Sequence, residues 1–323
     1  MRRIVRRVLA AVEVSRLPVA FGAVANVWLA ILLVRNDTEL ADSAASTLPL
    51  WEVLVAGALI AVGFLAFGAA LNDFLDAKHD RAFAPDRPLP AGDLRPHRAA
   101  QLAAVALCLG FLGTIPFGSA AMACAIALAV AILIYDAFAK HVPALGIVLA
   151  GLATALSMSV PCIETRALLP IWLAMSQTMG LGALAYVLGE KRPKLTRGSI
   201  AIGAAGWVFW TAVLFVLATE RNQGALLPQW PDARLLVAPA ATVLLCAAFG
   251  AWKLRRLRGP NVSDKLLRYG SLWKSLVAAA WLLAAGLPIE AGWIAGIATA
   301  IFVTVAILRE TGPQLSEPVS WRS

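Results

Sequence analysis

Residues 71–92 read LNDFLDAKHDRAFAPDRPLPAG, and here the end of a long apolar run meets a cluster of carboxylates. Asn72, Asp76 and Asp80 recur every four residues, so on a helix they form one stripe about 12 Å long. Asp73 lies beside this stripe. Carboxylates near hydrocarbon are costly and usually functional. Oxygen-bearing side chains in a row suit a hard divalent cation, and Mg²⁺ prefers a few carboxylates together with water and phosphate oxygens, so Asn72, Asp76 and Asp80 are the candidate metal ligands.

Basic residues follow the acidic row. Lys78, Arg81 and Arg87 suit an anionic ligand close by. The alternative is a helix that simply becomes polar where it leaves the membrane. Loops on the inner side of a membrane are typically basic, and acidic residues contribute little to topology. Three acids and an asparagine at this spacing therefore favour a site for a divalent metal or a polyanion.

The composition of the whole chain is that of a helical membrane protein. Of its 323 residues, 60% are hydrophobic and 15% are charged, and the mean hydropathy is +0.76. With glycine included, the apolar share is about two thirds, against about 45–50% in soluble domains. Such a chain is neither a soluble globule nor disordered, collagen-like or a disulfide scaffold. Its apolar runs are long and unbroken, which excludes a β-barrel, so we predict an all-α, polytopic transmembrane helix bundle.

Ten apolar runs are candidates to cross the hydrocarbon core, which takes about 20 residues. They are 17–34, 52–73, 99–116, 119–136, 142–162, 167–188, 199–218, 235–252, 271–287 and 290–308. The last two runs are short and meet at Gly286-Leu287-Pro288, so they could instead form one broken, re-entrant element. The prediction is nine to ten spans, with ten preferred.

The basic residues predict the orientation. The net charge is +9, and 24 of the 28 Lys and Arg residues fall in inner segments if the N-terminus lies inside. The other four are Arg35, Arg166, Arg221 and Arg234. This positive-inside distribution predicts a multi-pass protein of the plasma (inner) membrane, with its N-terminus and acidic row on the cytoplasmic side. This distribution accounts for the net positive charge, so no nucleic-acid partner is predicted. The expected partner is membrane lipid.

The chain is predicted to be a single membrane-embedded domain over residues 1–323. Residues 1–16 are expected to form an interfacial basic segment, and residues 309–323 an inner tail. Gly292 and Gly296 are separated by three residues, which predicts close helix packing at that point.

The acidic row and the residues after it resemble a known family. The pattern N-D-x-x-D-x-x-x-D followed by R-P-L-P-x-G is similar to that of the UbiA superfamily of intramembrane prenyltransferases. Its members here are Asn72, Asp73, Asp76, Asp80, Arg87, Pro88, Leu89, Pro90 and Gly92. The resemblance implies a bundle of about nine helices. It also implies that the acidic residues hold Mg²⁺, which binds the diphosphate of an isoprenoid donor.

A second stretch adds to the resemblance. Residues 134–146 read IYDAFAKHVPALG, and the family has a tyrosine and a lysine here that face the diphosphate. The resemblance assigns these places to Tyr135 and Lys140. Together with SRLPVAFGAVAN at residues 15–26, this stretch is most similar to the EboC-like branch.

The resemblance fails at a second acidic motif. The family carries this motif at the inner end of the sixth helix, where residues 185–198 read AYVLGEKRPKLTRG. Glu190 is the only acid in that stretch, and Lys191 and Arg192 follow it. Two aspartates that would hold a second metal are missing, so the second motif is degenerate.

Cations at this place offer one substitute for the second metal. An ionised diphosphate ester carries about three negative charges. With one Mg²⁺ at the acidic row, Lys140, Lys191 and Arg192 could balance them, because Lys and Arg stabilise a leaving phosphate as metals do. The alternative is that Lys191 and Arg192 are inner-loop charges that serve topology only.

The resemblance implies an enzyme that moves a prenyl group from an isoprenoid diphosphate to a lipid-soluble or cyclic acceptor, with Mg²⁺ assisting departure of the diphosphate. The catalytic candidates are Asp76, Asp80, Tyr135, Lys140 and Glu190. The candidates for substrate binding are Asn72, Asp73, Arg81, Arg87, Lys191 and Arg192. Glu190 or Asp136 could accept the proton that the acceptor loses.

Two other functions compete with prenyl transfer. One is a catalytically weakened relative that binds prenyl diphosphate or lipid headgroups. The other is a transporter, which is disfavoured because transporters place ionisable residues or broken helices at mid-membrane, and the mid-span regions here show no clustered charges.

Overall fold

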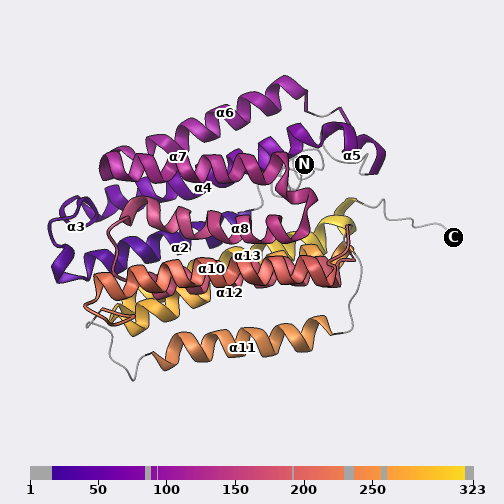
Figure 1. The fold of residues 1–323 in the computed structure, drawn as a ribbon. Coiled ribbons are helices and arrows are strands. Elements are labelled where there is room, and N and C mark those ends of the chain that lie inside the picture. The colour runs from indigo at the N-terminus through magenta and orange to yellow at the C-terminus, as the bar shows by residue number, and fades with distance from the viewer. Residues whose placement is uncertain are drawn as a thin grey trace.

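The computed structural model describes residues 17–83, 89–92, 94–190, 193–228, 236–255 and 260–316, and these residues form helices and turns without a β-strand. Among them the long helices are α2 (Leu17–Arg35), α4 (Leu50–Leu75), α6 (Pro96–Leu112), α7 (Gly118–Ala137), α8 (Pro143–Ser159), α9 (Leu168–Leu188), α10 (Arg197–Arg221), α11 (Val237–Leu254), α12 (Pro260–Ala284) and α13 (Pro288–Ser316). The short ones are α3 (Ala44–Thr47), α5 (Ala77–Phe83), η1 (Thr38–Leu40), η2 (Ile115–Phe117), η3 (Ala139–His141) and η4 (Val160–Cys162). The long helices lie side by side as a bundle (Figure 1).

Each predicted apolar run corresponds to one long helix, which confirms the all-α fold. Seven stretches of the described residues are long and apolar enough to cross a membrane, and one of them, Pro96–Ala137, contains both α6 and α7. The apolar part of α11 is shorter, and α12 carries Lys265, Arg268 and Lys274. The chain is therefore a multi-pass membrane protein, while the number of nine to ten spans and the orientation stay predictions. We call inner the helix ends that the charge distribution assigns to the cytoplasm.

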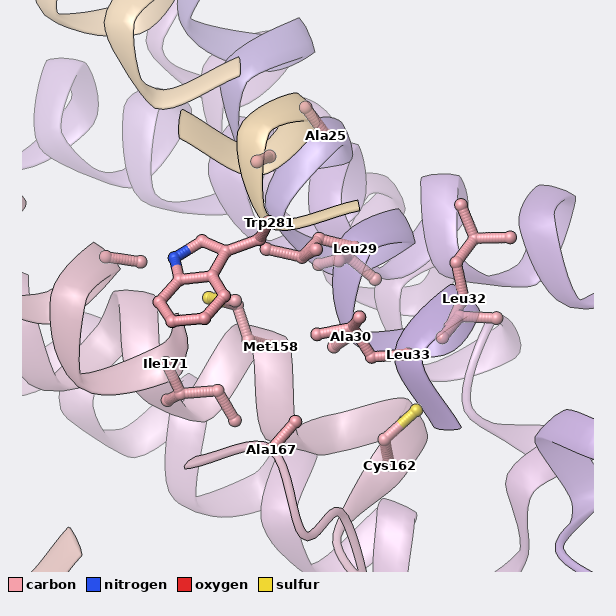
Figure 2. Close-up of a cluster of buried hydrophobic side chains, with 14 of the residues drawn as sticks. Ala25, Leu29, Ala30, Leu32, Leu33, Met158, Cys162, Ala167, Ile171 and Trp281 are labelled. Atoms are coloured by element: carbon pink, nitrogen blue, oxygen red, sulfur yellow. The ribbon is translucent and has the colours of Figure 1, made fainter. Parts of the chain in front are cut away.

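α2 lies at the centre of the bundle, packed against α4, α8, α12 and α13. Ala25 and Ile31 on this helix are fully buried. In Figure 2, Leu29 from α2 lies near Met158 from α8 and Trp281 from α12, within the largest buried apolar cluster. Because lipid is as apolar as these side chains, close packing between the helices holds this core together.

α2 and α12 run in the same direction with a constant register. Near their inner ends Gly22 lies against Ser271, whose hydroxyl group donates to Pro18 O. At their outer ends Asn36 Nδ2 donates to Ala285 O at 3.0 Å. Both the Gly22–Ser271 pair and the Asn36–Ala285 pair are 249 residues apart. Each residue of α2 is therefore level with the residue of α12 that lies 249 positions later.

The helices α4 and α6 cross at very short range. A Cβ atom added to Gly63 would lie 2.6 Å from Gly110 Cα and 2.9 Å from Ala106 O, so the two backbones touch. The prediction of close packing at Gly292 and Gly296 is wrong, because a Cβ atom at either position would meet no atom within 4 Å. Spacing shows that small residues recur, but it does not show whether another helix lies against them.

Gly63→Ala is expected to destabilise the protein by about 1–3 kcal/mol, because the added methyl group must push two helix backbones apart. Thermal unfolding of the purified protein in detergent measures the effect. Gly292→Ala is the matched control and should leave the melting temperature unchanged or slightly raised, since helical alanine is favoured over glycine. Equal melting temperatures for the two variants would contradict the crossing described here.

Arg166 joins three outer segments of the chain. Its side chain is 11% exposed, and Nη1 lies 2.7 Å from Glu39 Oε1 and 3.4 Å from Asp37 Oδ1. Its Nε donates to Arg221 O and to Asn222 Oδ1, both at 3.2 Å. The side chain therefore fastens the turn after α2 and the end of α10 to the connection between α8 and α9.

Candidate active site

The acidic row lies at the inner end of α4. Asp76 caps this helix, and α5 follows directly. Two backbone hydrogen bonds carry the helical register across the junction: Asp76 N–H donates to Asn72 O at 2.9 Å, and Asp80 N–H donates to Asp76 O at 2.8 Å. The three residues therefore stay one helical turn apart, as the stripe requires.

Lys140, on η3, reaches this row. Its Nζ lies 2.7 Å from Asp76 Oδ1 and 3.1 Å from Asn72 Oδ1. The side chains of Lys140 and Asp76 are 12% and 20% exposed, so the pair is largely shielded from water and the charged hydrogen bonds are strengthened. The fold thus brings Asn72 and Asp76 of the acidic row together with Lys140 of the stretch 134–146.

The contacts of Lys140 show that the row suits a cation. Two oxygen atoms, one from an amide and one from a carboxylate, converge on the ammonium nitrogen. Such oxygens are also the ligands that Mg²⁺ takes, at shorter distances of about 2.0–2.1 Å. Asp80, one turn further on, is 5% exposed. The donor set therefore fits Mg²⁺, although nowhere in the described ranges do three His, Cys, Asp or Glu side chains form a metal-binding group by themselves.

Tyr186, on α9, binds the backbone of Lys140. Its hydroxyl group donates to Lys140 O at 3.1 Å, so the inner end of α9 is tied to η3. Tyr186 is not among the site residues predicted from the sequence. The available signal was a lone hydroxyl-bearing residue at the inner end of an apolar run, four positions before Glu190.

Asp136, one candidate for the proton acceptor, packs against α4 near the row. It is 3% exposed, and a Cβ atom on Gly68 would lie 3.7 Å from its Oδ2. Gly68 precedes Asn72 by one helical turn, so this carboxylate lies against α4 one turn before the row. Glu190 is exposed at the inner end of α9.

The other predicted site residues are placed as follows. Asp73 and Tyr135 are partly buried, and each makes polar or ring contacts. Arg81 is exposed on α5. Three predicted site residues, Arg87, Lys191 and Arg192, lie outside the described residues, as does the interfacial segment 1–16.

Neither of two cavities in the described part of the chain is lined by a residue of the acidic row. One, of about 10 Å³, is enclosed by α2, α12 and α13 and includes Pro18 and Phe302 in its lining. The other, of about 290 Å³, is an open groove along α6 beside Arg98, Gln101 and Val105. The candidate site is therefore defined by its converging side chains and by neither of these cavities.

Glu190 has a backbone conformation that favours glycine, with φ at 52°. A non-glycine residue there costs about 1–2 kcal/mol, so Glu190→Gly is expected to raise the melting temperature. The same variant tests the predicted catalytic role, because loss of a general base lowers the rate by about 10²–10⁴-fold. Glu190→Gln removes the charge and keeps the backbone cost. If both variants lose catalytic rate, the carboxylate of Glu190 acts as the general base. If both rates are unchanged, Glu190 has no catalytic role.

Known proteins share the family and the fold of this chain. Residues 41–276 match the model of the UbiA prenyltransferase family. A digeranylgeranylglyceryl phosphate synthase shares the fold with a TM-score of 0.56 at 16% identity, over 87% of this chain and 99% of that chain. An apo UbiA homologue from Aeropyrum pernix K1 does so with a TM-score of 0.55 at 15% identity, over 82% of this chain and 97% of that chain. None of the curated proteins matches this chain. Since the family model spans most of its length, the chain belongs to the UbiA prenyltransferase family.

Proposed function

We propose that this protein is an integral membrane prenyltransferase, which moves a prenyl group from an isoprenoid diphosphate to a lipid-soluble or cyclic acceptor. The observation that carries the proposal is the convergence of Asn72, Asp76 and Lys140 at the inner end of α4. Membership of the UbiA prenyltransferase family supports the same class of reaction. The active site is proposed to face the cytoplasm, on the inner side of the plasma membrane.

Asn72, Asp76 and Asp80 would hold a Mg²⁺ ion. When bound there, the ion supplies positive charge that stabilises the departing diphosphate. Lys140 adds an ammonium group at the same point, and Arg81 and Asp73 lie on the same stretch of chain. Arg87, Lys191 and Arg192 are proposed to complete the cationic surroundings of the diphosphate, and Tyr135 to lie beside it.

The allylic C–O bond breaks, and its electron pair leaves with the diphosphate. The prenyl carbon then bonds to a nucleophilic atom of the acceptor, which loses a proton. Asp136 is the proposed proton acceptor because it is buried against α4, one turn from Asn72, and Glu190 is the alternative. Preorganised charge at the leaving group is expected to provide most of the rate enhancement.

Diphosphate release from geranyl diphosphate by the purified protein in lipid nanodiscs tests this function. We expect release that requires Mg²⁺ and stops when a chelator is added. Addition of a lipid extract should then give a product heavier by one prenyl group, detected by mass spectrometry. Binding of geranyl diphosphate without release or transfer would favour the alternative of a catalytically weakened binding protein.

The Mg²⁺ dependence also distinguishes one metal ion from two. The degenerate second motif predicts a simple hyperbolic dependence, because Asp76 and Asp80 form the one acidic pair predicted to bind metal. A cooperative dependence with two ions would contradict the single-metal version, in which Lys191 and Arg192 replace the second ion.

A further inference from the structure

Lys274 lies deep in the bundle. It is about 21 Å along α12 from Pro260, at 1.5 Å per residue. The register between α2 and α12 makes it level with Ala25, next to the central residue of α2. The charge distribution predicts an inner segment for Lys274, whereas the structure places it at mid-helix. An ionisable side chain at that depth is costly and marks a functional site by default.

The face of α12 that carries Lys274 points into the bundle. Gly270, one turn earlier, packs against Leu181 of α9. Ala278, one turn later, is 1% exposed. Trp281, two turns later, lies inside the cluster of Figure 2. Lys274 is partly buried on this face, so its ammonium group is directed toward neighbouring helices and away from lipid.

Asn26 lies at nearly the same depth as Lys274, on the neighbouring helix α2. The constant register makes Asn26 level with Ser275, one residue from Lys274. Asn26 is 5% exposed, and its neighbours on the same face, Leu29 and Ala30, belong to the cluster around Trp281. Two polar residues therefore lie at one depth, on the two packed helices α2 and α12.

These polar groups lack partners within the described part of the chain. No hydrogen bond or ion pair there involves the side chain of Asn26 or Lys274, and the buried Trp281 Nε1 has no hydrogen-bond partner. Buried polar groups are nearly always satisfied, and each exception calls for an explanation such as a missing ligand. The ammonium and indole groups are donors only, so the complement is a group that accepts hydrogen bonds and carries negative charge.

We propose that Asn26 and Lys274 bind an anionic group, a carboxylate or a phosphate, on the acceptor substrate. The inference rests on the proposed prenyl transfer. Lys274 lies further into the bundle than the acidic row at the inner end of α4, so the diphosphate and the anion of the acceptor would occupy separate points. The apolar body of the acceptor would lie between them, toward the prenyl carbon.

Thermal shifts of the purified protein in detergent test the proposal, with benzoate and phenyl phosphate as anionic probes and benzamide as the neutral match. We expect at least one anion to raise the melting temperature of the wild type and benzamide to have no effect. Lys274→Met should weaken anion binding by about tenfold or more, since hydrogen bonds to charged groups are strong. Lys274→Arg should retain part of the effect. Lys265→Met, an exposed change on the same helix, is the control.

A second arm with geranyl diphosphate and Mg²⁺ separates this site from the acidic row. Lys274→Met should keep the stabilisation by that donor. Loss of both responses would place Lys274 at the diphosphate and overturn the proposal, as would anion responses equal in Lys274→Met and the wild type, or absent from both. Benzoate uptake into proteoliposomes that requires Lys274 would also overturn it, in favour of transport. A wild-type response to an anion without any response to the donor would retain the anion site and contradict the proposed function.

Discussion

Replacing Asp76 by Asn is expected to reduce Mg²⁺-dependent release of diphosphate by about 10²–10³-fold, the usual effect of removing one preorganised electrostatic group from an active site. Asp76 Oδ1 is 2.7 Å from Lys140 Nζ, so the substitution removes the charge that holds this ammonium group in place. It also removes the carboxylate that would bind Mg²⁺ between Asn72 and Asp80. The fold should be preserved, because asparagine has nearly the same shape and Asp76 is only partly buried.

The measurement is the initial rate of diphosphate release at saturating Mg²⁺, together with the melting temperature. Asp42→Asn makes the same chemical change at an exposed outer position and should leave the rate unchanged. A rate for Asp76→Asn within threefold of the wild type would contradict the site. A large loss that is accompanied by unfolding would be resolved with Lys140→Met, which removes the other charge of this ion pair and should also reduce the rate.

Arg166→Ala is expected to lower the free energy of unfolding by about 3–5 kcal/mol, because removing one partner leaves buried charge and hydrogen-bonding groups uncompensated. Asp37 is 4% exposed and loses its ionic partner. Asn222, 6% exposed, loses the hydrogen bond from Arg166 Nε. The release of diphosphate, at the other end of the bundle, should be unaffected at temperatures where the protein remains folded.

Unfolding in detergent by heat or denaturant gives this free energy change. Arg166→Lys keeps the charge but loses the planar group that contacts several partners at once, so it should fall between the alanine variant and the wild type. Arg95→Ala removes an exposed arginine and should change stability by no more than about 0.5 kcal/mol. If the free energies of unfolding of Arg166→Ala and Arg95→Ala were equal, the stabilising contacts described for Arg166 would be contradicted.

Much of the fold could be predicted from the sequence because each apolar run spans most of one helix. The break predicted at Gly286 lies between α12 and α13, where Gly286 has φ of +77°. Which helices touch could not be predicted in the same way. Gly63 and Gly110 form the close crossing of α4 and α6, yet no local pattern pairs them, whereas Gly292 and Gly296 have the expected spacing and no close neighbour.

For the candidate site too, local spacing could be predicted from the sequence and contacts between helices could not. The local spacing of Asn72, Asp76 and Asp80 predicted one helical stripe, and the backbone hydrogen bonds keep that register. The contact from Tyr186 to Lys140 depends on how α9 packs against η3, which no local signal encodes. Metal binding by the row, the EboC-like branch and the consequence of the degenerate second motif stay predictions.

Lys140 acts as a tethered counterion in the ligand-free protein. Its ammonium group already neutralises Asp76, so a divalent ion arriving alone must compete with a cation that is covalently part of the chain. A diphosphate gives this ammonium group another anion to pair with, which frees the oxygens of the row for metal. Metal and donor should therefore bind with positive cooperativity, each tightening the affinity for the other by the same factor. Such reciprocity would keep the site from being saturated by metal in the absence of an isoprenoid.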